Sequence, residues 1–190
     1  MPLISSTLDI ILEKVLPFVL QDDYAEKWLF AYIGNIEMNE LDVYSKKLLR
    51  ELQLDSRRSM QELSARVGLS GTPCWRRVRE MEESGLIRRY TVLLDREKLG
   101  LHVCCLVSVN LQRHVKGAIQ EFEKAIGECP EVIECFSATG AADYLLKVVV
   151  PDIKAFDAFL NQVLFTLPGV DNVRTSVVLR EVKYETALPV

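Results

Sequence analysis

The segment from Asp42 to about Leu54 has the hydrophobic spacing of an amphipathic helix. Tyr44, Leu48 and Leu52 recur every four residues, which places them on one helix face. Asp42 is a suitable N-cap, because a short polar side chain can accept a hydrogen bond from a free backbone N–H at a helix start. We therefore predict a first helix whose apolar stripe must pack against another apolar surface of the protein.

A second helix is predicted directly after the first. Ser59 and Glu62 have the spacing of a capping box, in which each side chain satisfies a free backbone donor of the other residue. Leu63 and Val67 then face inward, and Gly68 can adopt the left-handed conformation that ends a helix. This second apolar face supplies the partner for the first.

A third helix begins near Ser70 or Thr72, either of which can serve as its N-cap, and Pro73 is tolerated in its first turn. At about 100 degrees per residue, the inward face of this helix consists of Cys74, Val78 and Met81. Thr72, Arg76 and Arg79 fall on the opposite face. We therefore expect the two arginines to point away from the core.

The third helix is expected to end at Ser84 and Gly85, and the segment Leu86–Leu94 is prone to form a strand. Arg88 and Arg89 lie near the start of this segment, in the position of a wing. Helices joined by a short turn and followed by a basic strand are typical of a winged helix-turn-helix, which binds DNA.

The second half of the chain alternates strand-like and helix-like segments. The predicted order βαββαβ covers Leu101–Leu111, Val115–Gly127, Val132–Ala138, Tyr144–Val150, Asp152–Leu167 and Val173–Tyr184. With right-handed crossovers, this order gives a four-stranded antiparallel sheet with both helices on one face, the ferredoxin-like arrangement. The predicted fold class is α+β: an N-terminal winged helix-turn-helix and a C-terminal ferredoxin-like βαββαβ domain.

The strands of this domain are apolar on both faces. In the first strand, for example, Val103, Cys105 and Val107 alternate with Cys104 and Leu106. Because the helices cover only one face, the other would leave apolar side chains in water, and exposed apolar patches of that size mark interfaces. We therefore predict at least a dimer formed through the sheets, which would also present two DNA-binding helices.

The charge is unevenly distributed along the sequence. The net charge of the chain is -4, but residues 41–100 carry 13 Lys and Arg against 9 Asp and Glu. Residues 1–40 carry 2 basic against 7 acidic residues, and residues 101–190 carry 8 against 11. A basic module in an acidic chain is what a phosphate-binding face requires, although a solvated surface of mixed charge gives the same count.

No metal, cofactor or catalytic site is expected. The 5 cysteines form no paired spacing suited to zinc, and His102 with Cys104 would supply too few ligands. The sequence contains no glycine-rich phosphate loop and no nucleophile elbow. An enzyme is therefore a weak alternative.

The first 38 residues form a separate extension, which we interpret either as an added helix or as the product of an upstream start codon. Its apolar run Leu8–Leu20 is interrupted by charged residues and is too short to span a bilayer. It also lacks the basic start and cleavage site of a signal peptide. We therefore expect no membrane association and a cytoplasmic location.

From about Leu41 to Leu188 the sequence resembles the leucine-responsive and asparagine-responsive regulator family, Lrp/AsnC. The resemblance is carried by Leu48–Gln53, Glu62–Ser70, Thr72–Cys74, Arg77-Val78, Glu82, Gly85–Ile87, Thr139-Gly140 and Asp143–Leu146. It implies a DNA-binding domain followed by a sensor domain that binds an amino acid at interfaces between dimers. It also implies dimers that often assemble into octamers, and control of amino-acid metabolism.

We accordingly divide the chain into four parts: the extension 1–38, the winged helix-turn-helix domain 39–95, a linker 96–100, and an effector-binding and oligomerisation domain 101–190. The candidates for DNA contact on the third helix and at its start are Ser70, Thr72, Pro73, Trp75, Arg76, Arg77 and Arg79. The candidates for phosphate contact are Arg57, Arg58, Arg88 and Arg89. Arginine can pair bidentately with guanine or bind phosphate, so these residues suit double-stranded DNA.

By resemblance, the effector candidates are Thr139, Gly140, Ala142 and Asp143, with Thr175 and Ser176 as weaker ones. Free amides in the loop could bind a ligand carboxylate while Asp143 pairs with an ammonium group. The same loop also reads as an ordinary hairpin connection. The predicted function is therefore a sequence-specific transcriptional regulator modulated by an amino acid or a similar metabolite, and the alternative is an architectural DNA-binding protein without an effector.

Overall fold

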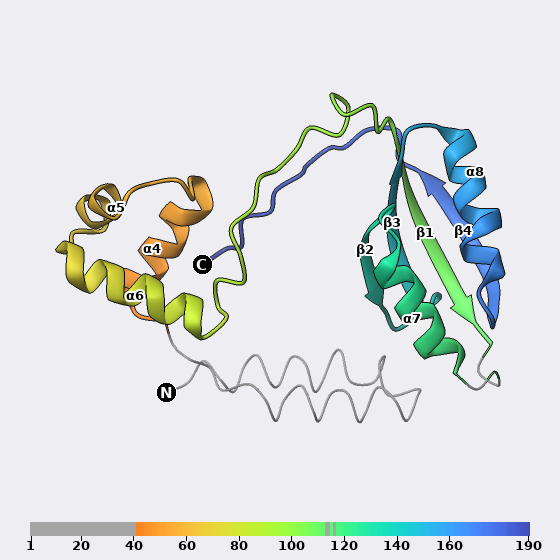
Figure 1. Cartoon of the computed structure of the whole chain (residues 1–190), viewed down its shortest axis with the longest axis horizontal. Coiled ribbons are helices and arrows are strands. Elements are labelled where there is room, and N and C mark those ends of the chain that lie inside the picture. Colours follow the sequence, from red (N-terminus) through yellow and green to blue (C-terminus); the bar gives the residue numbers. More distant parts are fainter. Residues whose placement is uncertain (1–40, 113–114, 116) are drawn as a thin grey trace. The chain divides into compact units, whose positions relative to one another are not determined.

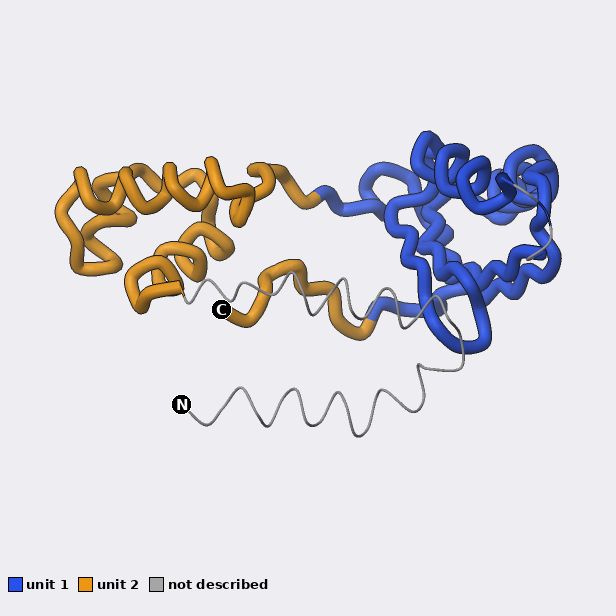
Figure 2. The backbone as a smooth tube through the Cα atoms, turned by 90° about the horizontal axis from the view of Figure 1, so that it is seen from below, with its two compact units in different colours: residues 1–36, 94–181 blue, residues 37–93, 182–190 orange. Residues whose placement is uncertain are grey.

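The computed structural model describes residues 41–112, 115 and 117–190, so the predicted extension of residues 1–38 lies outside the described residues. The described chain divides into two compact units (Figure 2). The helical unit contains residues 41–93 and 182–190, and the sheet unit contains residues 94–181. This division differs from the expected domain 101–190 at its end, because the last nine residues group with the helices.

The helical unit consists of three helices, α4 (Val43–Leu54), α5 (Met60–Val67) and α6 (Gly71–Glu83) (Figure 1). The capping predictions are confirmed: Asp42 accepts the backbone N–H of Ser45 at 2.7 Å, and Ser59 and Glu62 form the capping box. Gly68 ends α5 with φ +75°. Local polar residues therefore fix where α4 and α5 begin, and a glycine in the left-handed conformation fixes where α5 ends.

The core of the helical unit contains the predicted apolar residues except Tyr44, which is 40% exposed, and it also contains Leu49, which was not predicted. Its buried residues are Leu48, Leu49, Leu52, Leu63, Val67, Cys74, Val78 and Met81. Cys74, Val78 and Met81 come from one face of α6, so the opposite face is left for solvent. This packing fixes which way the polar side chains of α6 point.

The sheet unit contains β1 (Val103–Leu111), α7 (Ala118–Glu128), β2 (Val132–Ser137), β3 (Tyr144–Val150), α8 (Ile153–Gln162), a 3₁₀ turn (Leu164–Thr166) and β4 (Val170–Val177). The strand order is β2-β3-β1-β4, and all neighbouring pairs are antiparallel. The predicted ferredoxin-like arrangement is confirmed. Phe122 of α7 and Phe156 of α8 belong to one buried cluster, so both helices cover the same face (Figure 1).

The register separates the two faces of the sheet. Val107 pairs with Leu146 and Val109 with Tyr144, and all four side chains are buried beneath the helices. On the other face, which we call the open face, Leu106, Phe136 and Leu145 are 50%, 57% and 43% exposed. The prediction that apolar side chains remain on this face is confirmed for these three residues.

Two predicted strand segments are not formed. Residues 88–95 are extended without ladder pairing, and β4 ends at Val177 instead of continuing to Tyr184. A strand needs a neighbour for its backbone N–H and C=O groups. The last such bond of β4 joins Val178 N to Cys104 O at 2.9 Å, one residue from the start of β1 at Val103.

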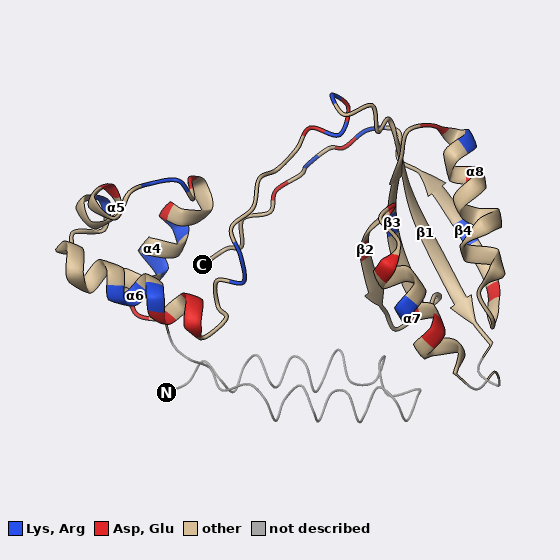
Figure 3. Cartoon of the chain, in the orientation of Figure 1, with Lys and Arg blue, Asp and Glu red and all other residues tan. Residues whose placement is uncertain are grey.

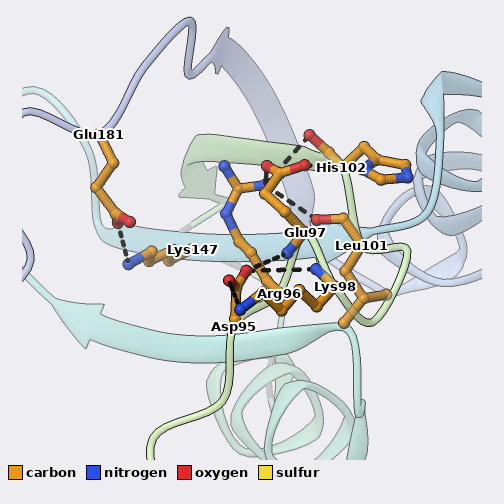
Figure 4. Close-up of polar contacts among 8 residues, drawn as sticks. All are labelled: Asp95, Arg96, Glu97, Lys98, Leu101, His102, Lys147 and Glu181. Carbon is orange, nitrogen blue, oxygen red and sulfur yellow. Dashed lines mark hydrogen bonds and ion pairs between the residues drawn. The ribbon is translucent and has the colours of Figure 1, made fainter.

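The predicted linker of residues 96–100 forms an ordered turn of the sheet unit (Figure 4). Arg96 donates to the main-chain oxygens of Leu101 and His102 at 3.0 and 3.2 Å. Glu97 pairs with Arg96 at 2.9 Å and with the ring of His102 at 2.7 Å.

In the described ranges, no helix is long and apolar enough to cross a bilayer.

Candidate DNA-binding surface and effector loop

The outward face of α6 carries most of the predicted DNA contacts. Arg76 and Arg79 have side chains that are 66% and 57% exposed, and Trp75 is 54% exposed. Thr72 is exposed beside them. Because Cys74 and its neighbours hold the inner face in the core, these side chains extend from a rigid support.

Arg76 and Arg79 lie near carboxylates one turn further along α6. Arg76 Nε is 3.5 Å from Glu80, and Arg79 Nε is 2.8 Å from Glu83. Figure 3 shows the basic residues of this helix followed by acidic ones at its C-terminal end. Exposed pairs of this spacing contribute only about 0.3 to 0.5 kcal/mol. Each guanidinium can therefore exchange its carboxylate for a phosphate or a guanine edge at little cost.

The N-terminus of α6 is also suited to bind an anion. Ser70 is the N-cap, but its side chain makes no capping hydrogen bond. The free backbone donors at a helix start and the positive end of the helix dipole together attract phosphate. Ser70 and Thr72 lie at this helix start.

Arg77 does not share this exposed surface. Its Nη2 donates to Asp42 at 2.7 Å, its guanidinium lies 5.9 Å from the centre of the Tyr44 ring, and its side chain is 23% exposed. The backbone hydrogen bond from Ser45, and in addition Arg77, hold the pKa of Asp42 below its usual value. The geometry thus gives Arg77 a role in fastening α6 to the start of α4, which sequence patterns did not indicate.

The four arginines predicted to contact phosphate have different surroundings. The Arg58 side chain is 16% exposed and donates to both the carboxylate and the main-chain oxygen of Glu51. Arg57 is 93% exposed, and Arg88 and Arg89 are exposed as well. Arg58 therefore fixes the connection between α4 and α5, whereas the other three are available to phosphate.

The predicted effector loop is the hairpin between β2 and β3. Asp143 accepts the backbone N–H of Leu111 at 2.8 Å, and its own N–H donates to Val109 at 3.1 Å. Asn110 donates to Ala141 O at 3.1 Å. The Asp143 carboxylate thus fastens the hairpin to the end of β1, a structural role that the sequence did not indicate.

The remaining effector candidates are spread over the sheet. Thr139 and Gly140 are exposed in the hairpin, and Ala142 is half-buried. Thr175 and Ser176 lie on β4, which is separated from β3 by β1. Thr175 pairs with Val107 and Ser176 with Leu106, so the two side chains point to opposite faces. Within one chain the structure does not bring the six candidates together.

A capped three-helix unit with an exposed basic helix, joined to a ferredoxin-like sheet unit, defines the class of two-domain DNA-binding regulators. Comparison with protein families agrees with this class. A winged helix-turn-helix DNA-binding family matches residues 41–88, and the Lrp/AsnC ligand binding domain matches residues 104–188. The chain therefore belongs to the Lrp/AsnC family of transcriptional regulators.

Several characterised relatives match over most of the chain. The Bkd operon transcriptional regulator of Pseudomonas aeruginosa is 41% identical over 152 residues, which cover 80% of this chain and 99% of the relative. The leucine-responsive regulatory protein of Escherichia coli is 42% identical over 149 residues, which cover 78% and 91%. The matches of about 150 residues leave part of the chain uncovered.

Solved structures show the same architecture. A transcriptional regulator of Neisseria meningitidis in complex with L-Met superposes with a TM-score of 0.75 at 38% identity, covering 78% of this chain and 96% of that one. An AsnC family transcriptional regulator from Agrobacterium tumefaciens gives a TM-score of 0.74 at 41% identity, covering 78% and 97%.

Proposed function

We propose that this protein binds specific operator DNA as a dimer through the exposed face of α6 and that an amino acid bound to its sheet unit changes this binding. The observation that carries the proposal is the exposure of Arg76 and Arg79 on a helix whose opposite face is buried in the core. The N-terminus of α6 and Arg57, Arg88 and Arg89 would hold the DNA backbone.

The amino-acid effector is supported by similarity. The ligand-binding family match covers residues 104–188, and the relative from Neisseria meningitidis was solved with L-Met. Within this chain, the exposed amides of the hairpin at Thr139 and Gly140 suit a carboxylate. Asp143 would add a negative charge for the ammonium group.

We further propose that dimers assemble into larger oligomers, up to octamers, and that a second copy completes the effector site. The scattered positions of Asp143, Thr175 and Ser176 support this, because residues far apart in one chain can meet across an interface. As a DNA-binding regulator, the protein would act in the cytoplasm.

The test is a titration of amino acids into the protein bound to DNA from its own promoter region, with gel shift and light scattering as readouts. We expect at least one amino acid to change both DNA affinity and oligomer size, because an effector must bind the two states differently. Tight DNA binding that no amino acid alters would instead favour the architectural alternative.

An Asp143→Asn variant separates the two roles of Asp143. The amide oxygen of asparagine can still accept the Leu111 N–H, so the hairpin should keep its shape, while the charge for an ammonium group is lost. We expect unchanged thermal stability and a roughly 10-fold or larger loss of effector sensitivity. Asp143→Ala is less informative, since it would leave the N–H of Leu111 without its acceptor. An unchanged effector response in Asp143→Asn would remove this residue from the site.

A further inference from the structure

The C-terminal residues 182–190 belong to the helical unit, although they follow the last strand of the sheet unit. We call residues 186–190 the C-terminal segment. Its main chain is bound by two exposed side chains of α4. Gln53 accepts the Leu188 N–H at 2.5 Å and donates to the Leu188 oxygen at 3.1 Å, and Arg50 donates to the Val190 oxygen at 2.5 Å.

These contacts involve main-chain groups of the C-terminal segment and one apolar side chain. The paired bonds between Gln53 and Leu188 satisfy a donor and an acceptor of the same residue, as a neighbouring strand would. Leu188 itself is 71% exposed, so its side chain is not the anchor. Val190 instead packs against the buried cluster that holds α4, α5 and α6 together.

The same stretch of chain is held at its other end by the sheet unit. Glu181, the last residue of that unit, is 3.6 Å from Lys147 of β3 (Figure 4). Lys147 also lies 3.7 Å from Glu134 of β2. Residues 182–190 therefore follow directly on a residue that is held by an ion pair within the sheet unit.

We propose that the surface of α4 around Arg50 and Gln53 is a docking site for the protein's own C-terminal segment, and that this docked segment stabilises the DNA-binding helices. A three-helix unit of this size buries little apolar surface, so one additional core residue and three hydrogen bonds change its stability appreciably. Release of the segment loosens the support of α6 and lowers DNA affinity. This last step rests on the proposed function, whereas the docking does not.

The experiment is amide hydrogen exchange on the full chain without DNA, followed by DNA affinity on the same samples. Gln53→Ala removes both partners of Leu188, and we expect exchange at Leu188 and along α4 to accelerate about 10-fold or more. Gln53→Glu keeps the acceptor for the Leu188 N–H but loses the donor, so its effect should be smaller. Gln61→Ala, at an exposed glutamine of α5, is the matched control. It should change neither the exchange rate at Leu188 nor the exchange rates along α4.

We expect the DNA affinity of Gln53→Ala to fall several-fold. A Leu188 amide that exchanges as fast as an unstructured one in the wild-type protein would overturn the docking site. Faster exchange in Gln53→Ala with unchanged DNA affinity would overturn the link to α6. A wild-type protein that binds no DNA would overturn the proposed function, while the exchange data would still decide the docking site.

Discussion

Arginines that are equivalent in the sequence have different roles in the structure. Arg76 and Arg77 are neighbours, yet one is exposed and the other is held between Asp42 and Tyr44. Arg57 and Arg58 differ in the same way. Helix periodicity assigns the faces of α6, but the partners of Arg77 and Arg58 lie at the start of α4 or within it, which local spacing does not reveal. A count of arginines in the sequence therefore overestimates how many of them are exposed.

The exposed arginines give the first prediction. Arg76→Ala and Arg79→Ala should each weaken operator binding, by about 1 to 3 kcal/mol if the side chain contacts a base. The fold should remain intact, because only exposed pairs with Glu80 and Glu83 are lost. Fluorescence anisotropy with operator DNA and circular dichroism measure the two effects.

Glu83→Gln provides the matched control for Arg79. It removes the carboxylate 2.8 Å from Arg79 and should leave operator binding unchanged or strengthen it slightly. Arg77→Ala should instead lower stability, because Asp42 and Tyr44 lose their partner. Operator affinity that is the same in the Arg76, Arg79 double variant as in the wild type would contradict the proposed surface.

The carboxylate of Asp42 gives a prediction about pH. Its pKa is lowered by the backbone hydrogen bond from Ser45 and also by Arg77, so folding favours the charged form. This stabilisation is fully present above the unfolded pKa of about 3.9 and is lost as the pH falls through the lower folded value. Asp42→Asn keeps a capping oxygen but removes the charge. Its melting temperature should therefore depend less on pH below about pH 5 than that of the wild type. Melting temperatures that fall equally with pH in the two proteins would contradict the role assigned to the charge of Asp42.

Among the helices and strands, the sequence predicts those starts and ends that depend on residues close by in the chain. The caps Asp42 and Ser59 and the stop at Gly68 were identified because their hydrogen bonds or backbone angles are local. The segment Leu86–Leu94 was wrongly predicted as a strand, because side-chain preference favours extended backbone but does not supply a partner. The docking of Val190 on the helical core joins residues too distant for any periodicity to show.

Gly169 controls how β4 starts beside α7. Its φ is +81°, and a Cβ atom would lie 2.7 Å from the Cβ of Ala118 and 3.6 Å from that of Val115. Its oxygen also accepts the N–H of Gln112 at 2.7 Å. Gly169→Ala therefore combines an unfavourable backbone angle with a collision, and we expect it to destabilise the sheet unit by about 2 to 4 kcal/mol in urea unfolding.

Gly127→Ala tests the same change in the same unit without these constraints. Gly127 lies in α7, and no atom other than those of its chain neighbours and the nearby helix backbone lies within 4 Å of the Cβ it would gain. Alanine is the better helix former, so this variant should be stabilised by up to about 1 kcal/mol. If both variants unfolded at the wild-type urea concentration, Gly169 would have no special role.

At the scale of the whole molecule, the open face of the sheet is neither a solvated surface nor a uniform apolar one. Leu106, Leu145 and Phe136 are exposed there, beside Lys147 with its carboxylates Glu134 and Glu181. A polar network within an apolar patch is typical of interfaces between subunits, where it restricts which surfaces can pair. A second copy presents the same patch, so a two-fold arrangement matches it to itself.

Leu106 is the residue of choice for testing this interface, because it lies on β1, the strand between β3 and β4, and half of its surface is exposed. Leu106→Lys should hardly affect folding of the sheet unit, whose core lies on the other face. It should shift the protein toward the monomer in sedimentation, since a buried unpaired charge typically costs an interface several kcal/mol. Operator affinity should then fall at low protein concentration, because a monomer presents only one α6. Leu99→Lys, at a residue outside the strands that is 57% exposed, serves as the control for an added charge. A Leu106→Lys variant that sediments as the wild type would exclude the open face as the interface.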